Sequence, residues 1–404
     1  MPRHHPCTAS LLLSLLCAPA LAVETSLRLT DVAPGAIDGL NGLDAAVLGD
    51  ALYFVGRPVA GTRALYRYDG VNPPTQVPDS VVPKPIEVVA WNGKLYFSGG
   101  PVDNREVWFY DPAGPTVGLA VDVRPGGHGN PQRFAVVGDQ LCFAANSTAS
   151  GFELFCWDGT GPASLFDIAP GAESSFPNLL TTWGTRLAFT ALINGVTGLW
   201  IYDGTNPPAQ VESAASEWFN TPYALTPTAE DLYFSAGGVD FVDRIWRYDG
   251  LEPPTRLSTT FRPWGTPGTP RGLLVVTGED PDAGVDDTEL WRLVDGSLRR
   301  VAPGVMIGRQ ESAVDAAGAI ALISEIVPGS GELHLLRFCG KGALAPTDAF
   351  LASGAAVRSE RVVPFAGQLV VSAADAAHGE ELWSVTPSAL LCDDFETGDA
   401  ANWP

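Results

Sequence analysis

Short apolar segments recur along almost the whole chain at a regular interval. The copies are rich in apolar residues, as in ALYFVG and KLYFSG, and successive copies are 42 to 49 residues apart. A repeat of this length is typical of propeller blades or helical arrays, and the β-rich composition favours blades. The aligned positions of the copies are Leu52, Leu95, Leu141, Leu187, Leu232, Leu274, Ile320 and Leu369.

Each copy belongs to a larger unit in which we expect four strands. A second strand follows after a short polar loop, as in ALYRYDG and ELFCWDGT, and most copies of it end in Asp-Gly. Glycine accepts the positive φ of a tight turn, so Asp-Gly predicts a hairpin. A third strand follows that turn, and a fourth precedes the next apolar copy. Four strands per unit are typical of a propeller blade, so the sequence predicts an all-β fold, a β-propeller of eight four-stranded blades.

The two ends of the repeat array predict how the ring closes. Residues 26–33, SLRLTDVA, form an isolated strand pattern before the first unit, whereas the eighth unit ends after its third strand, ELWSV. The N-terminal strand would complete that last blade. Such a closure pairs both edges of the array and leaves no edge strand exposed to aggregation.

The second-strand motifs also carry a family resemblance. ELFCWDGT and GLWIYDGT resemble the bacterial ELWxxDGT repeat family, and the resemblance extends over residues 24–386. The second unit, KLYFSGGPVDNREVWFYDPAG, is in addition similar to a kelch blade. Both resemblances imply a propeller-like fold. The ELWxxDGT family has no established common chemistry, so the resemblance implies almost nothing about activity.

The two termini predict export and divide the chain into three parts. Residues 1–22 combine an apolar run with Ala20-Leu21-Ala22, the pattern of a cleaved signal peptide. We expect a single propeller domain over residues 23–390 and an acidic tail over residues 391–404. That tail is similar to a short segment that ends many exported proteins of Gram-negative bacteria. The protein is therefore expected to be secreted or periplasmic, and surface association stays open.

Charge and hydropathy narrow the range of partners. The formal net charge is −22, and it becomes −23 once the signal peptide, which holds Arg3 and no acid, is removed. Such a surface repels phosphate backbones and anionic lipids, which argues against nucleic acid and membrane surfaces as partners. No later segment approaches the ~18 consecutive apolar residues of a membrane span. We expect a monomer.

Four cysteines follow the predicted cleavage site, and an even number in an exported protein indicates disulfides. Cys142 and Cys156 lie on consecutive strands of the third unit, where a hairpin would place them opposite each other. Cys339 and Cys392 would then join the seventh unit to the C-terminal tail. Two other connectivities are formally possible, and a zinc site lacks the required Cys-x-x-Cys spacing.

One acidic loop in the sixth unit is the candidate metal site. GEDPDAGVDDTEL brings together Asp280, Asp282, Asp286 and Asp287 around a glycine. Calcium takes six to eight oxygen ligands, and closely spaced aspartates can supply several of them. The spacing departs from an EF-hand loop, and a solvated acidic loop is the alternative. We expect no other cofactor.

Two residue types recur at equivalent positions of most units and have structural as well as functional interpretations. Tryptophan recurs in the second motif, where it could stack on sugars or pack between blades, and glutamate begins the same strand in five units. Packing explains both patterns, since architecture alone repeats them. Three scattered histidines follow the signal peptide, without any nucleophile elbow or phosphate-binding loop.

The leading hypothesis is consequently a binding or adhesion scaffold for an unknown extracellular ligand, a glycan or a protein. We expect no catalytic residues. A glycan-processing enzyme that uses paired carboxylates and a structural protein of the cell envelope remain the alternatives.

Overall fold

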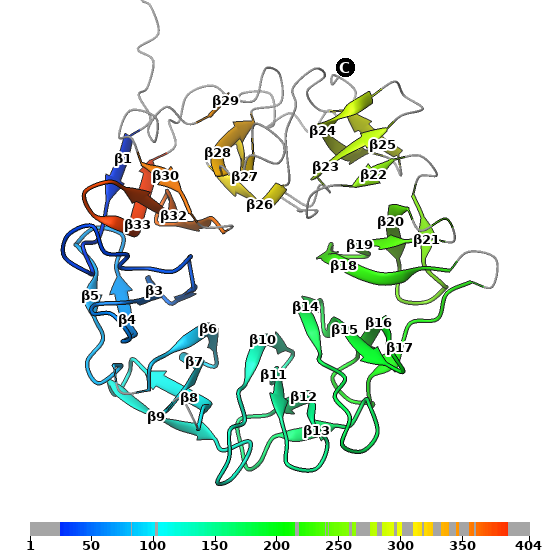
Figure 1. Cartoon of the computed structure of the whole chain (residues 1–404), viewed down its shortest axis with the longest axis horizontal. Helices are drawn as coiled ribbons and strands as arrows, with labels where there is room; N and C mark the ends of the chain where they lie inside the picture. Colours follow the sequence, from blue (N-terminus) through cyan, green and yellow to red (C-terminus); the bar gives the residue numbers. More distant parts are fainter. Residues whose placement is uncertain are drawn as a thin grey trace, which may run out of the picture.

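In the computed structural model, β-strands arranged as a ring of sheets are the regular structure of the described residues (Figure 1). These residues are 25–386, apart from 82, 102–103, 215–217, 239, 241, 258–260, 264–274, 281–284, 295–296, 301–309, 317–318, 326–332, 339–344, 347–354 and 359–360. The described part of the chain contains no helix, so the predicted all-β class is confirmed, and the chain is a β-propeller.

Six sheets follow one another along the chain, each made of four consecutive antiparallel strands. The labels β6 to β9 show the order within one of these sheets, in which the first strand lies nearest the centre of the ring and the fourth lies at the periphery (Figure 1). The first three sheets are β2 (Ala45–Leu48), β3 (Ala51–Gly56), β4 (Ala64–Tyr68) and β5 (Thr75–Gln76); β6 (Ile86–Trp91), β7 (Lys94–Gly99), β8 (Glu106–Asp111) and β9 (Thr116–Val121); and β10 (Gln132–Val137), β11 (Gln140–Asn146), β12 (Phe152–Trp157) and β13 (Ser164–Phe166). The next three are β14 (Asn178–Trp183), β15 (Arg186–Ile193), β16 (Val196–Tyr202) and β17 (Ala209–Gln210); β18 (Asn220–Pro227), β19 (Leu232–Gly237), β20 (Asp243–Tyr248) and β21 (Thr255–Arg256); and β22 (Arg262–Pro263), β23 (Val275–Asp280), β24 (Val285–Val294) and β25 (Ser297–Arg300).

The strands of the last two expected units pair with each other and with the N-terminal strand. They form one sheet because Leu333 of β28 pairs with Val357 of β30. This pairing joins units that the repeat predicts as separate blades, and the count of eight blades stays a prediction. The strands are β26 (Gln310–Ala316), β27 (Ala319–Glu325), β28 (Leu333–Phe338), β29 (Ala345–Pro346), β30 (Ala356–Val357), β31 (Val363–Phe365), β32 (Gln368–Asp375), β33 (Gly379–Thr386) and β1 (Thr25–Arg28).

The N-terminal strand closes the ring as the sequence predicts. β1 pairs antiparallel with β33 over four residues, from Thr25 opposite Thr386 to Arg28 opposite Trp383. The strand is shorter than the predicted 26–33. After Arg28 the backbone leaves the ladder, and the amides of Val32 and Ala33 turn toward the side chain of Glu381.

The core lies between neighbouring sheets. In one cluster, Leu52 and Phe54 of β3 pack against Val370 of β32 and Leu382 of β33, so the first and last units of the chain share a core. Where side chains are described, large apolar residues are buried on both faces of a sheet. This burial explains the nearly continuous apolar runs of strands such as β3 and β7. The ring is therefore held together by contacts between sheets as well as by the β1–β33 pairing.

A bulge recurs in the innermost strands. The register of β6, β10, β14 and β18 shifts near the second residue of each strand, and that residue has a positive φ: Glu87 (54°), Arg133 (61°), Leu179 (53°) and Thr221 (45°). Bulges turn a side chain away from the regular alternation of a strand. Four innermost strands therefore present one reoriented residue each, and its chemistry differs from sheet to sheet.

Candidate functional site: a charged pocket at the inner end of the first two sheets

The repeated glutamates of the second motif have a structural role wherever the structure describes their side chains. The carboxylate of Glu153 in β12 accepts hydrogen bonds from Ile168 N (3.0 Å) and from Ser175 N (2.7 Å), in the segment that leads from β13 to β14. Glu106 accepts equivalent bonds from Val123 N (2.7 Å) and Gly129 N (2.9 Å). These carboxylates fix the crossover from one sheet to the next.

The last glutamate of this series holds the ring closure. Glu381 in β33 accepts bonds from Thr30 Oγ1 (2.6 Å), Val32 N (3.0 Å) and Ala33 N (3.4 Å). A Cβ on Gly39 would collide with this carboxylate. Burial raises the pKa of Glu381, although the Thr30 hydroxyl and the two amides act in the opposite direction.

The other repeated residues are likewise used by the architecture. Trp246 is completely buried, and its indole N–H donates to Ala236 O at 3.2 Å, whereas Trp200 is buried against Phe189. The aspartates of the Asp-Gly turns accept bonds from backbone amides two residues ahead, as Asp203 does from Thr205 N (2.8 Å). Neither series is available as a ring of ligand-binding groups.

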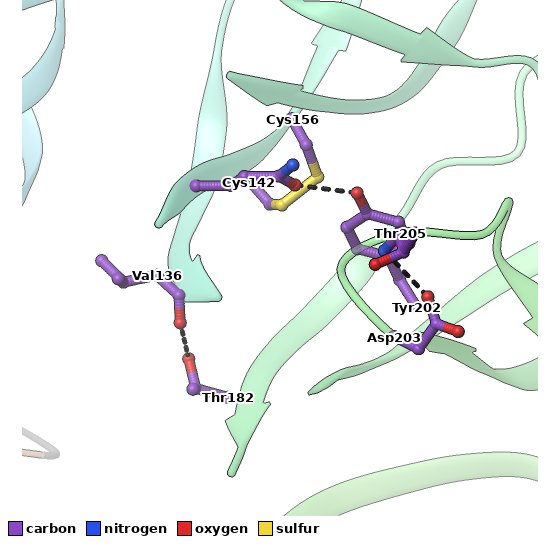
Figure 2. Close-up of a disulfide and its surroundings, with 8 residues drawn as sticks. Val136, Cys142, Cys156, Thr182, Tyr202, Asp203 and Thr205 are labelled. Atoms are coloured by element: carbon purple, nitrogen blue, oxygen red, sulfur yellow. Dashed lines mark hydrogen bonds between the residues drawn. A yellow bond between two sulfur atoms is a disulfide. The ribbon is translucent and has the colours of Figure 1, made fainter. Parts of the chain in front are cut away.

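The predicted disulfide of the third unit is present. Cys142 of β11 pairs directly with Cys156 of β12, and their sulfur atoms are bonded. Figure 2 shows this disulfide beside the hydrogen bond from Thr182 Oγ1 to Val136 O (2.7 Å), which joins the third and fourth sheets. Both cysteines belong to the apolar cluster between those sheets, which gives the disulfide a structural role.

Two further sequence predictions lie outside the described residues. Cys339 and Cys392 are not among them, and neither is Asp282. Asp280, Asp286 and Asp287 are described only as backbone, in β23 and β24. The second disulfide and the calcium loop therefore stay predictions, as do the signal peptide and the tail. Where side chains are described, no group of three or more His, Cys, Asp and Glu residues could hold a metal ion.

The described histidine side chains each interact with another residue of the protein. His128 Nδ1 accepts a bond from Arg105 N (3.1 Å), and His378 Nδ1 lies 2.9 Å from Asp375 Oδ1 in the hairpin between β32 and β33. Within the described residues, the ring of His378 has no hydrogen bond to a serine, threonine or cysteine. The described part of the chain thus offers no activated nucleophile of the triad type.

A pocket of about 190 Å³ lies where β2 begins, β3 ends and β4 begins, against the start of β6. We call it the rim pocket. It lies beside β2 and β6, which are the first strands of their sheets. Its side chains come from two sheets and from loops outside the repeated motifs. It is lined by Asn41, Asp44, Val55, Arg57, Arg63, Ile86 and Glu87.

Two carboxylates of the rim pocket are held by backbone amides of the neighbouring sheet. Asp44 accepts hydrogen bonds from Glu87 N and from Val88 N (2.8 Å), and Glu87 in turn accepts one from Arg133 N. The positive φ of Glu87 and Arg133 directs these amides toward the preceding sheet. A chain of hydrogen bonds therefore links the inner ends of the first three sheets.

Desolvation raises the pKa of both carboxylates. It raises the pKa of Asp44, against the effect of its two backbone hydrogen bonds and of the charges of Arg361 and Arg63. It also raises the pKa of Glu87, and the neighbouring charge of Asp44 adds to that rise. Such shifts are frequent at functional sites, although structural networks produce them too.

The rim pocket is surrounded by positive charge, although the chain is strongly acidic. Arg57 and Arg63 line it, and Arg105, Arg133 and Arg361 lie close enough to shift the pKa of Asp44 or Glu87. Five arginines thus accompany two carboxylates in a protein of net charge −22. Within the described residues, the side chains of Arg57 and Arg63 make no hydrogen bond and no ion pair.

Sequence patterns did not indicate this site. Its residues lie in loops and at strand ends that vary from unit to unit. They are therefore not part of any repeated motif. One signal was available, since Arg57 and Arg63 lie close together in the first unit of an acidic chain and Arg105 follows in the second unit. Arg361 comes from the other end of the chain and reaches Asp44 only because the ring closes.

Comparisons with known proteins identify the fold and nothing more specific. No family model matches the chain, and no curated protein matches it. A puromycin-hydrolyzing peptidase of Mycobacterium tuberculosis has a similar structure, with a TM-score of 0.53 and 14% sequence identity. The similarity covers 86% of this chain and 60% of that peptidase chain.

A second similar structure is the β-propeller domain of the Trilobed protease from Pyrococcus furiosus. It shares 10% sequence identity with a TM-score of 0.47, over 76% of this chain and 97% of that one. At such identities a similar structure shows the fold alone. Among the described residues of this chain, no helix is long and apolar enough to cross a membrane.

Proposed function

We propose that this protein is a binding protein, expected to be exported, and that its ligand enters the rim pocket. The observation that carries the proposal is that the repeated residues with described side chains are used by the architecture, whereas the side chains of Arg57 and Arg63 in the rim pocket make no hydrogen bond and no ion pair within the described residues. Both arginines lie in the short connection between β3 and β4, two paired strands of one sheet, which gives the site a fixed support. At about 190 Å³, the pocket accommodates a small ligand or one group of a larger one.

Binding is better supported than hydrolysis by the state of the two carboxylates. A glycosidase needs one carboxyl group that can donate a proton and a second that can attack or activate water. Asp44 and Glu87 both accept backbone hydrogen bonds from the next sheet, which fixes them as parts of the scaffold. The proposal therefore assigns no catalytic residue.

The test compares the wild-type protein with a variant in which the pocket is blocked. Asn41 is exposed and lines the pocket, so Asn41→Trp should fill it without disturbing the core. Val71→Trp is the matched control, because Val71 is 85% exposed in a turn at the end of β4. Both variants and the wild type are applied to arrays of polysaccharides, oligosaccharides and peptides.

We expect saturable binding of at least one array component to the wild type and to Val71→Trp, and its loss in Asn41→Trp. Equal binding by all three proteins would place the ligand elsewhere and refute the assignment to the rim pocket. Release of product over multiple turnovers would contradict a role in binding alone. Absence of saturable binding by the wild type would refute the proposed function and favour a structural role.

A further inference from the structure

We propose that the rim pocket binds an oxyanion, a carboxylate, sulfate or phosphate group of a small ligand, between the guanidinium groups of Arg57 and Arg63. This inference rests on the proposed function and specifies the chemistry of its ligand. It is carried by the placement of two arginines in a pocket whose carboxylates already have hydrogen-bond donors.

The geometry favours an anionic group of a ligand, rather than a carboxylate of the protein, as the partner of the two arginines. Arg57 follows the end of β3 and Arg63 precedes β4, so one hairpin contributes both arginines to the lining of the pocket. Asp44 and Glu87 accept amide hydrogen bonds and remain on the side of the neighbouring sheet. Neither carboxylate forms an ion pair with either arginine within the described residues.

The positive charges around the pocket also favour binding of an anion. Burial lowers the pKa of Arg105, and the nearby positive charge of Arg63 lowers it further, although Glu87 acts in the opposite direction. The guanidinium of Arg105 donates to Lys84 O at 2.9 Å and 3.1 Å, which is a neutral acceptor. A bound anion would reduce the mutual repulsion of these groups, so the charge of the site is complementary to an oxyanion.

The chemistry of the side chains narrows the ligand to planar or tetrahedral oxyanions. Guanidinium groups present parallel N–H donors that fit carboxylate, sulfate and phosphate oxygens in pairs. Since one water occupies about 30 Å³ of liquid, the pocket holds the volume of about six waters, enough for one such group and the adjoining atoms. We therefore expect recognition of an acidic group on a ligand whose remainder lies outside the pocket.

Calorimetric titration with glucuronate, sodium sulfate and inorganic phosphate tests the inference, with glucose as the neutral counterpart of glucuronate. Variants Arg57→Gln and Arg63→Gln each remove one guanidinium. Arg67→Gln removes the same charge at the opposite end of β4, where Arg67 lies 3.7 Å from Asp50. Arg63→Lys keeps the charge without the paired donors, and unliganded melting temperatures verify the fold of each variant.

The expected result is binding of at least one anion, weakened about tenfold or more by Arg57→Gln and by Arg63→Gln and unchanged by Arg67→Gln. Arg63→Lys should lose less, and added sodium chloride should weaken all anion binding. Anion affinity that is equal in the wild type and the glutamine variants would overturn the inference, and so would the absence of any anion binding. If neutral ligands bind and Asn41→Trp abolishes that binding, the proposed function survives and only the oxyanion assignment fails.

Discussion

Replacing Glu381 tests whether one buried carboxylate holds the ring closed. Its side chain is completely buried and accepts hydrogen bonds from the Thr30 hydroxyl and the amides of Val32 and Ala33. Glu381→Ala leaves these donors without their acceptor in a region closed to water. An unsatisfied buried donor costs about 1 to 3 kcal/mol, so three donors at the lower limit give a loss of about 3 kcal/mol.

The isosteric variant separates the loss of acceptors from the loss of volume. Glu381→Gln keeps one acceptor oxygen but places an amide N–H₂ among the same donors, and we expect it to cost about 1 to 2 kcal/mol. Glu252→Ala is the control, since Glu252 is exposed in a turn. Urea unfolding followed by tryptophan fluorescence gives the free energy of unfolding of each protein.

Hydrogen exchange locates the effect in the structure. In Glu381→Ala the amides of residues 25–33 should exchange faster than in the wild type, because β1 is held on β33 by only four paired residues. The amides of β11 and β12, in the third sheet, should be unaffected. A free energy of unfolding for Glu381→Ala within 0.5 kcal/mol of the wild type would refute this role of the carboxylate.

Three further predictions follow from the same interactions. Replacing Cys142 and Cys156 together by alanine should lower the free energy of unfolding by about 3 kcal/mol, because the disulfide closes a loop of about 15 residues in the unfolded chain; equal urea midpoints for variant and wild type would contradict this. Trp246→Ala should cost about 3 to 5 kcal/mol by leaving a cavity, whereas Leu251→Ala, at an 84% exposed position, should cost little, and similar losses from both would refute the core role of the tryptophan. Burial raises the pKa of Glu153 above its ordinary 4.5, so the folded state binds more protons than the unfolded state just above that pH, and stability should fall as the pH rises through that window. Urea titrations from pH 4.5 upward should show this slope and a smaller one in Glu153→Gln, and equal slopes would exclude the contribution of Glu153.

The strand order, the ring closure and one disulfide could be predicted from the sequence because each depends on local or repeated signals. Alternating apolar residues define the strands, and the unpaired pattern at each end of the array predicts that β1 completes the last sheet. Cys142 and Cys156 lie on adjacent strands of a single hairpin, so their pairing follows from local geometry. The structural interpretation of the repeated glutamates and tryptophans is confirmed at Glu106, Glu153, Glu381 and Trp246 for the same reason, since architecture repeats with the unit.

The rim pocket was decided by the tertiary structure alone. Asp44 and Arg361 lie at opposite ends of the array and come together only when the first and last sheets pack side by side. The bulge that turns Glu87 inward occupies the same position as Thr221 in another sheet, so the backbone repeats while the side chain does not. The repeated residues are those that neighbouring sheets require in order to pack. The arginines that line the rim pocket are not required for this packing, so they differ from unit to unit and no repeat pattern contains them.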